Sequence, residues 1–156
     1  MDSKNQAAAH MNSSPFTRAT SLGYQINYLA RLLEQTLRQR INKYGVVPGQ
    51  FAQLLALYEE EPLTQRELCE RVRIEQPTMA YTLQRMERDG LIVRVPDSLS
   101  DRRQTHISLT PQAKELRIPL TTEAQNGNKI ATRGLTQAEV YTFMSIMERI
   151  IRNLEQ

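Results

Sequence analysis

Cysteine is almost absent from this sequence, since Cys69 is the only one in 156 residues. A single cysteine excludes a disulfide within the chain and a metal site built from cysteines. A chain without disulfides suits a reducing compartment, so we expect a cytoplasmic protein. We interpret Cys69 itself as a small, partly buried residue of the interior.

Long apolar runs are also missing. No run approaches the ~18 residues that a membrane-spanning helix needs, and the opening residues MDSKNQAAAHMNSS lack the apolar core of a secretory signal. We therefore expect no membrane partner and a disordered tail over residues 1–16. The remaining chain has the composition of an ordinary globular protein, with 40% hydrophobic and 24% charged residues.

The residue types that most enzymes need for catalysis are few and scattered. Only two histidines occur, His10 and His106, and neither has metal-ligand spacing around it. No glycine-rich phosphate loop is present, and we interpret the acidic run 59–61 as a solvated helix end before a proline. We therefore expect no catalytic site, no metal and no bound cofactor, and the protein is predicted not to be an enzyme.

Lysine is scarce, because only four of the 20 basic residues are lysines and the others are arginines. The planar fork of donors on arginine suits phosphates and guanine edges. The net charge of +3 permits a nucleic acid as a partner without requiring one. Residues 62–103 contain eight arginines and seven acidic residues, so this segment is not broadly basic.

Helical spacing of the apolar residues predicts two helices at the start of the ordered chain. The first has an apolar stripe from Leu22 to Ile41, and Gly45 follows its end. Pro48 and Gly49 separate it from a second helix with Phe51 and Leu54 on its apolar side.

A pair of shorter helices follows. Thr64 and Glu67 have the spacing of a capping box, which predicts a helix start. Pro77 opens the next helix and Gly90 ends it. On this second helix three residues fall on one side and face the core, Met79, Leu83 and Met86, whereas the opposite side has polar, aromatic and basic residues throughout.

The apolar period then changes from that of a helix to that of a strand. Leu91, Val93 and Val95 alternate with Ile92 and Arg94, and Thr105, Ile107 and Leu109 alternate in the same way. We therefore predict a β-hairpin with a long polar tip, Asp97 to Arg103. Helix, turn, helix and hairpin is the order of a winged helix-turn-helix.

Helices are predicted again after the hairpin. Thr110 and Pro111 begin one, which Pro119 should kink or interrupt. Thr136 and Glu139 form a second capping box. The last helix has a wide apolar stripe that a partner subunit would cover.

The run LTQRELCERVRIEQPTMAYTLQRMERDGLIVRVPDSLSDRRQTHISLTPQAKEL, residues 63–116, resembles the winged-helix core of the MarR family, the multiple-antibiotic-resistance type regulators. The matching features are L-T-x-x-E-L at 63–68, G-L-I-x-R at 90–94, and D-x-R followed by x5-L-T at 101–110. Members also have a long first helix and two long C-terminal helices, so the resemblance covers about residues 18–154.

The resemblance implies a mainly α-helical fold with a small β-wing. Residues 61–110 would form the DNA-binding winged helix-turn-helix, and residues 17–60 and 111–156 a helical dimerisation lobe. A homodimer would place two recognition helices in successive major grooves, so its operator on double-stranded DNA would be an imperfect palindrome. The family suggests a bacterial, nucleoid-associated transcription regulator that acts as a repressor.

The predicted DNA contacts lie on two elements. A carboxylate at Asp101 can brace one arginine of the wing while its neighbour enters the minor groove, and the sequence leaves open which arginine enters. On the recognition helix the candidates are Gln76, Thr78, Tyr81, Thr82, Arg85 and Arg88, and on the wing they are Asp101, Arg102 and Arg103.

Control by a ligand is also implied by the resemblance. Family members often bind a small anionic or aromatic compound in the crevice between the two lobes, and such a compound changes the spacing of the DNA-binding lobes. The candidate pocket residues are Tyr24, Tyr28, Tyr44 and Phe51, for which packing at the seam between the lobes is the alternative. Members that sense peroxide use a cysteine in the first helix, where this chain has none.

A second function stays open at this point. A winged helix can also be a protein–protein interaction module without specific DNA binding. Salt dependence separates the two, because binding to DNA through several phosphates weakens steeply as salt rises.

Overall fold

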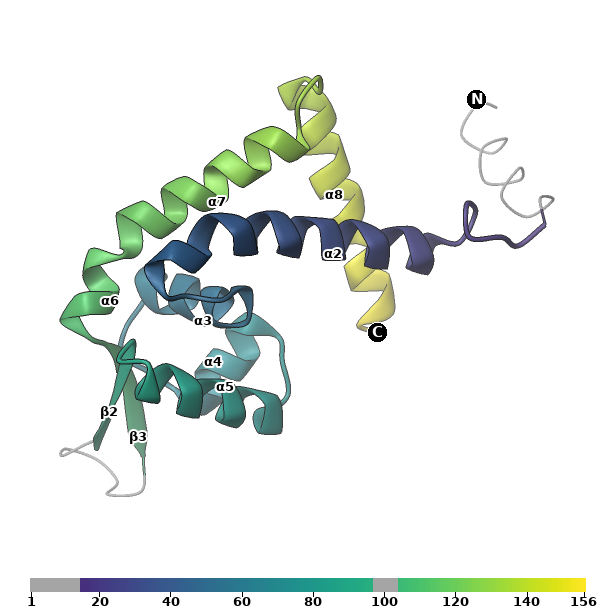
Figure 1. Ribbon diagram of the computed structural model, residues 1–156. Helices are drawn as coiled ribbons and strands as arrows, with labels where there is room; N and C mark the ends of the chain where they lie inside the picture. Colours follow the sequence, from purple (N-terminus) through teal and green to yellow (C-terminus); the bar gives the residue numbers. More distant parts are fainter. Residues whose placement is uncertain (1–14, 97–103) are drawn as a thin grey trace.

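Helices make up most of the fold, which a computed structural model describes for residues 15–96 and 104–156 (Figure 1). The fold is mainly α-helical with a small antiparallel sheet, as the sequence predicts. The elements in chain order are α2 (Leu22–Ile41), η1 (Asn42–Tyr44), α3 (Pro48–Glu59), β1 (Leu63–Thr64), α4 (Gln65–Val72), α5 (Gln76–Arg88), β2 (Ile92–Pro96), β3 (Thr105–Leu109), α6 (Pro111–Glu115), α7 (Arg117–Ala131) and α8 (Gln137–Leu154).

The predicted capping boxes are present at both helix starts. The Thr64 hydroxyl accepts the backbone N–H of Glu67 at 3.2 Å, and the Glu67 carboxylate accepts the Thr64 N–H at 2.7 Å. Thr136 and Glu139 form the same reciprocal pair at the start of α8. Each box satisfies two N–H groups that a helix start would otherwise leave without partners.

The sheet has one strand more than the predicted hairpin. Its order is β1-β3-β2, with β1 pairing antiparallel to β3 so that Leu63 lies opposite Ile107. On β2 Ile92 is buried, whereas Val93 and Val95 are exposed. The Arg94 guanidinium, on the same side of the strand as Ile92, donates to the Glu87 carboxylate of α5, so this side of β2 faces the helices.

Pro119 interrupts the helix that follows the wing, as predicted. The break lies at Leu116, between α6 and α7, and places Pro119 in the first turn of α7. The missing N–H of proline has no intrahelical partner to lose in a first turn. The two helices therefore meet at an angle instead of forming one rod (Figure 1).

One hydrophobic core joins the helix-turn-helix to the long helices. Met79, Leu83 and Met86 of α5 are fully buried, and the same cluster includes Ile41 at the end of α2 and Leu120 of α7. Figure 1 shows α5 and the hairpin at one end of the molecule, with α7 running from α6, near the hairpin, to α8 at the other end.

Helix α8 lies outside this core. None of its residues is buried, although it has large apolar side chains on one side. Within the described parts of the chain, no helix is at once long and apolar enough to cross a membrane.

Candidate nucleic-acid interface

The outer face of α5, which we define as Thr78, Tyr81, Thr82, Arg85 and Arg88, is opposite the buried residues of the same helix. Each of these side chains has a group that can hydrogen-bond, and none is aliphatic apart from the threonine methyls. Thr78, Tyr81 and Arg88 are exposed, whereas Thr82 and Arg85 are half-buried. The helix can therefore present this face to a partner without disturbing the core.

Contacts within the outer face hold some of its side chains in place. The Arg85 guanidinium lies over the Tyr81 ring, 5.8 Å from the ring centroid, in the arrangement of a cation–π contact. The Thr82 hydroxyl donates to the Thr78 carbonyl at 3.0 Å, so its oxygen can still accept a hydrogen bond. Arg85 is thus partly oriented before any partner arrives.

The start of α5 is linked to the start of α4. Gln65 Nε2 donates to Gln76 Oε1 at 3.0 Å. Gln76 is exposed and Gln65 is half-buried. Gln76, a predicted contact residue, is therefore held by a residue of the preceding helix and lies beside the outer face of α5 rather than in its middle.

The end of α5 is held by the Asp89 carboxylate. Gln50 Nε2 donates to Asp89 Oδ2 at 2.9 Å and Arg88 Nε donates to Oδ1 at 3.2 Å. These contacts lower the pKa of Asp89 below its ordinary value, and the hydrogen bond from Gln50 has the largest effect. Arg88 is consequently paired on one side while its guanidinium stays exposed.

The base of the wing is attached to α5 and to α6. Arg94 of β2 donates to Glu87 of α5 at 3.2 Å. The Thr110 hydroxyl donates to the Gly90 carbonyl at 2.6 Å and accepts the Ala113 N–H at 3.1 Å. The predicted wing contacts, Asp101, Arg102 and Arg103, lie outside the described residues.

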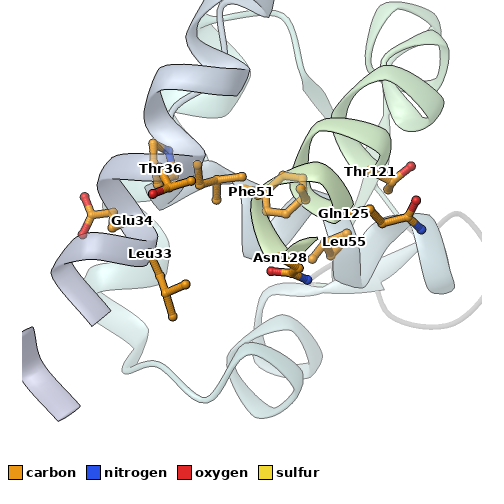
Figure 2. A pocket seen from close by; sticks show the side chains of 12 residues that line it. Leu33, Glu34, Thr36, Phe51, Leu55, Thr121, Gln125 and Asn128 are labelled. Carbon is orange, nitrogen blue, oxygen red and sulfur yellow. The ribbon is translucent and has the colours of Figure 1, made fainter. Parts of the chain in front are cut away.

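A pocket of about 490 Å³ lies between α2, α3 and α7. Figure 2 shows Leu33 and Thr36 of α2 on one side, Gln125 of α7 on the other, and the Phe51 ring between them. Such a volume is in the range of sites for small organic molecules. Its lining is mostly apolar and comprises Leu33, Glu34, Thr36, Leu37, Pro48, Phe51, Leu55, Thr121, Ala124, Gln125, Gly127 and Asn128.

A family model described as "MarR family" matches residues 44–104. The solved structure of the transcriptional regulator PA3341 is 30% identical, with a TM-score of 0.74, and the match covers 86% of this chain and 98% of that one. The chain belongs to the MarR family.

Two further relatives of this MarR family member extend over nearly the whole chain. The uncharacterized HTH-type transcriptional regulator YsmB of Bacillus subtilis is 25% identical over 94% of this chain and 99% of its own length. A MepR–DNA complex from S. aureus has a TM-score of 0.77 at 20% identity and covers 88% of this chain and 99% of that one. The latter shows a likeness of fold.

The aromatic candidates for a ligand site in this MarR family chain do not come together. Phe51 lines the pocket between α2, α3 and α7. Tyr28 instead lines an apolar groove of about 480 Å³ between α2 and α8. Tyr24 is exposed near the start of α2, and Tyr44 packs against the core at the other end of that helix.

Cys69 is buried in α4, in agreement with its interpretation as an interior residue. Burial raises the pKa of its thiol. The reactive form of cysteine is the thiolate, so its raised pKa makes Cys69 a poor nucleophile at neutral pH.

Two residues that position the interface were missed by reasoning from sequence. Gln65 and Gln50 hold Gln76 and Asp89, each through a side-chain amide from a different helix. Gln65 has a signal in the sequence, since it is the first residue after the capping threonine of α4, close to the turn that leads to α5. Gln50 has none, because its partner lies 39 residues away.

Proposed function

We propose that this chain regulates transcription by binding double-stranded DNA in a sequence-specific way through the outer face of α5. One observation carries the proposal: a helix whose inner face is fully buried presents an outer face made of hydrogen-bonding groups, next to a hairpin at the same end of the molecule. Helices presented in this way enter the major groove, where base edges offer donors and acceptors.

A second copy of the chain would complete the DNA-binding unit. Helix α8 has no buried residue, and its apolar side forms an apolar groove with α2. We infer that the same surface of a partner subunit covers these side chains, because a single chain would otherwise leave them in water. A two-fold dimer presents two copies of α5 one helical turn apart, so its operator is an imperfect palindrome.

A small molecule would control the affinity for DNA, with the pocket between α2, α3 and α7 as its site. The pocket lies where α7 meets α2 and α3, so an occupant would change the packing between these three helices. Its lining contains Glu34 and neither arginine nor lysine, which favours an uncharged aromatic compound over an anionic one. With repression as the basal state, such an effector would release the DNA.

Binding, and not catalysis, is the activity that we infer for this chain in the bacterial cytoplasm. The relatives described above are named as transcriptional regulators. No group of three histidine, cysteine or acidic residues that could hold a metal occurs among residues 15–96 and 104–156. The competing function is a protein-interaction module. The hydrogen-bonding side chains on the outer face of α5 favour DNA binding over it.

A salt titration tests this function. The preferred duplex is first selected from a random library, and its affinity is then measured from about 50 to 200 mM salt, over which several phosphate contacts would lower it by about 10³-fold or more. Footprinting should show two protected half-sites about 10 base pairs apart from centre to centre. Affinity that does not respond to salt, together with no protected duplex, would favour the protein-interaction module.

A further inference from the structure

The hydrogen bond between Gln65 and Gln76 lies at the point where a recognition helix enters the groove. Residues at the start of such a helix contact base edges. Gln76 is the first residue of α5 and is exposed, while Gln65 is the first residue of α4. The two side chains come from different helices, so their contact depends on the helix-turn-helix fold.

The direction of this hydrogen bond decides what Gln76 offers to DNA. Gln65 Nε2 donates and Gln76 Oε1 accepts. An amide oxygen has two lone pairs, so Gln76 Oε1 can accept one more hydrogen bond, and both N–H groups of Gln76 Nε2 stay free. The amide therefore presents one acceptor and one donor side by side.

An acceptor and a donor in this arrangement match the major-groove edge of adenine, which offers the N6 amino group and the N7 atom. An amide that rotates freely can present either order of its two atoms and gains less from a match. Fixing one rotamer before binding removes that cost.

We propose that Gln65, a residue outside the recognition helix, is a positioning residue that fixes the Gln76 amide so that it reads one adenine in each half-site. This inference rests on the proposed function and adds the base and the residue that orients its reader. Gln65 touches no base in this arrangement and acts through Gln76.

Five variants test the assignment on the full-length protein, each measured against duplexes in which every half-site base pair is changed in turn. Gln76→Ala should lower the preference for adenine at one position about tenfold. Gln65→Ala should lower it at the same position, with affinity for unrelated duplexes unchanged within about twofold. Combined with Gln76→Ala, the Gln65→Ala change should cause no further loss, since the two residues act as a unit.

Gln65→Lys and Gln65→Glu separate positioning from a direct contact with phosphate. Lysine keeps a donor for Gln76 Oε1, so the preference for adenine should survive, with higher affinity for all duplexes. Glutamate has no donor and would turn the amide around by accepting from Gln76 Nε2, so the preference should be lost. A phosphate contact predicts instead that both changes alter affinity for all sequences and leave the preference as it is.

The proposal is overturned if Gln65→Ala keeps the preference for adenine, or if its effect falls on a different base pair from that of Gln76→Ala. It is also overturned if Gln76→Ala abolishes a preference for a base other than adenine. Failure of the proposed function looks different, because the unaltered protein would then show no base preference at any position.

Discussion

Arg73 and Glu155 form an ion pair with 3.1 Å between Nη1 and Oε1, although 82 residues separate them. Arg73 ends α4 in a left-handed conformation, with φ of 58°, and Glu155 directly follows α8. The pair therefore joins the turn of the helix-turn-helix to the end of the last helix within one chain.

The Arg73–Glu155 pair should contribute little to stability, because the two side chains are 65% and 53% exposed. We expect Glu155→Gln to change the free energy of unfolding by less than about 0.5 kcal/mol. Urea denaturation measures this, with Glu34→Gln as the matched control, since it removes another exposed pair, that with Arg38. A loss above about 2 kcal/mol from Glu155→Gln alone would mean that the pair is part of a larger structural contact.

Placing a charge on the apolar side of α8 should break the dimer. Phe143 is 47% exposed in the single chain and lines the groove with α2, so Phe143→Glu would place a carboxylate in the subunit interface. We expect the dissociation constant of the dimer to rise about 100-fold or more, from the lost burial of an aromatic side chain in each subunit. Sedimentation equilibrium measures the constant. Ser145→Glu, on the opposite side of α8, is the control and should leave the dimer intact; equal effects of the two would contradict the interface.

Arginines of the two elements proposed to bind DNA, α5 and the wing, should have different roles. Arg85→Ala should relax base preference at one position in each half-site, at a cost of about 1–3 kcal/mol. Arg103→Ala should weaken binding to all sequences alike and make the salt dependence shallower by about one phosphate contact. Selection of preferred duplexes followed by salt titration of each variant distinguishes them. The reverse pattern would mean that the roles of helix and wing are exchanged.

Stability should fall in acid partly through Glu123 of α7. Lys43 and Arg40 donate to its carboxylate at 2.8 and 3.0 Å, and these contacts lower the pKa of Glu123 below its ordinary value of 4.5. A pKa lowered by folding gives stability that is present above about pH 4.5 and is lost as the pH falls through the folded-state pKa.

Glu123→Gln tests this pH dependence. The variant should be less stable than the parent at pH 7, and the difference should shrink as the pH falls below about 4.5. Urea midpoints measured from pH 3 to 7 give the comparison. Glu148→Gln on α8 serves as a control for the loss of one negative charge, and a gap between Glu123→Gln and the parent that is constant over this range would contradict a role for the charged carboxylate.

Peroxide should leave DNA binding unchanged. Cys69 is buried and its thiol pKa is raised, so little thiolate is present to react. We expect the affinity for the preferred duplex to change by less than about twofold after treatment with millimolar peroxide. Mass spectrometry of the treated protein should find the thiol unoxidised. A loss of binding in the parent but not in a Cys69→Ala variant would show a redox response after all.

Much of the fold could be predicted from local patterns. The inner face of α5 follows from helical spacing, which places Met79, Leu83 and Met86 together, and all three are fully buried. Helix starts at Thr64 and Thr136 follow from capping boxes, which depend only on residues three positions apart.

Features that depend on distant partners could not be predicted in this way. Strand β1 has two residues and exists through its pairing with β3, which no pattern within Leu63–Thr64 could indicate. Alternation along β2 leaves open which side faces the helices, and here the side with Arg94 does, where Arg94 pairs with Glu87 of α5. Tyr58 likewise donates to the Ala113 carbonyl at 2.6 Å across 55 residues, and burial raises the pKa of Tyr58 to about 12.

Ile41, Leu120 and the inner face of α5 share one core, so we expect the helix-turn-helix and the long helices to unfold as one cooperative unit. A fragment limited to residues 61–110 would lose the partners that Met79 and Leu83 have in the intact chain, and would expose them to water. The inner face of α5 thus shares its core with side chains from segments on both sides of it in the sequence. A displacement of α7 would reach α5 by way of this shared core, because α7 packs on α2, α2 on α3 and α3 on α5.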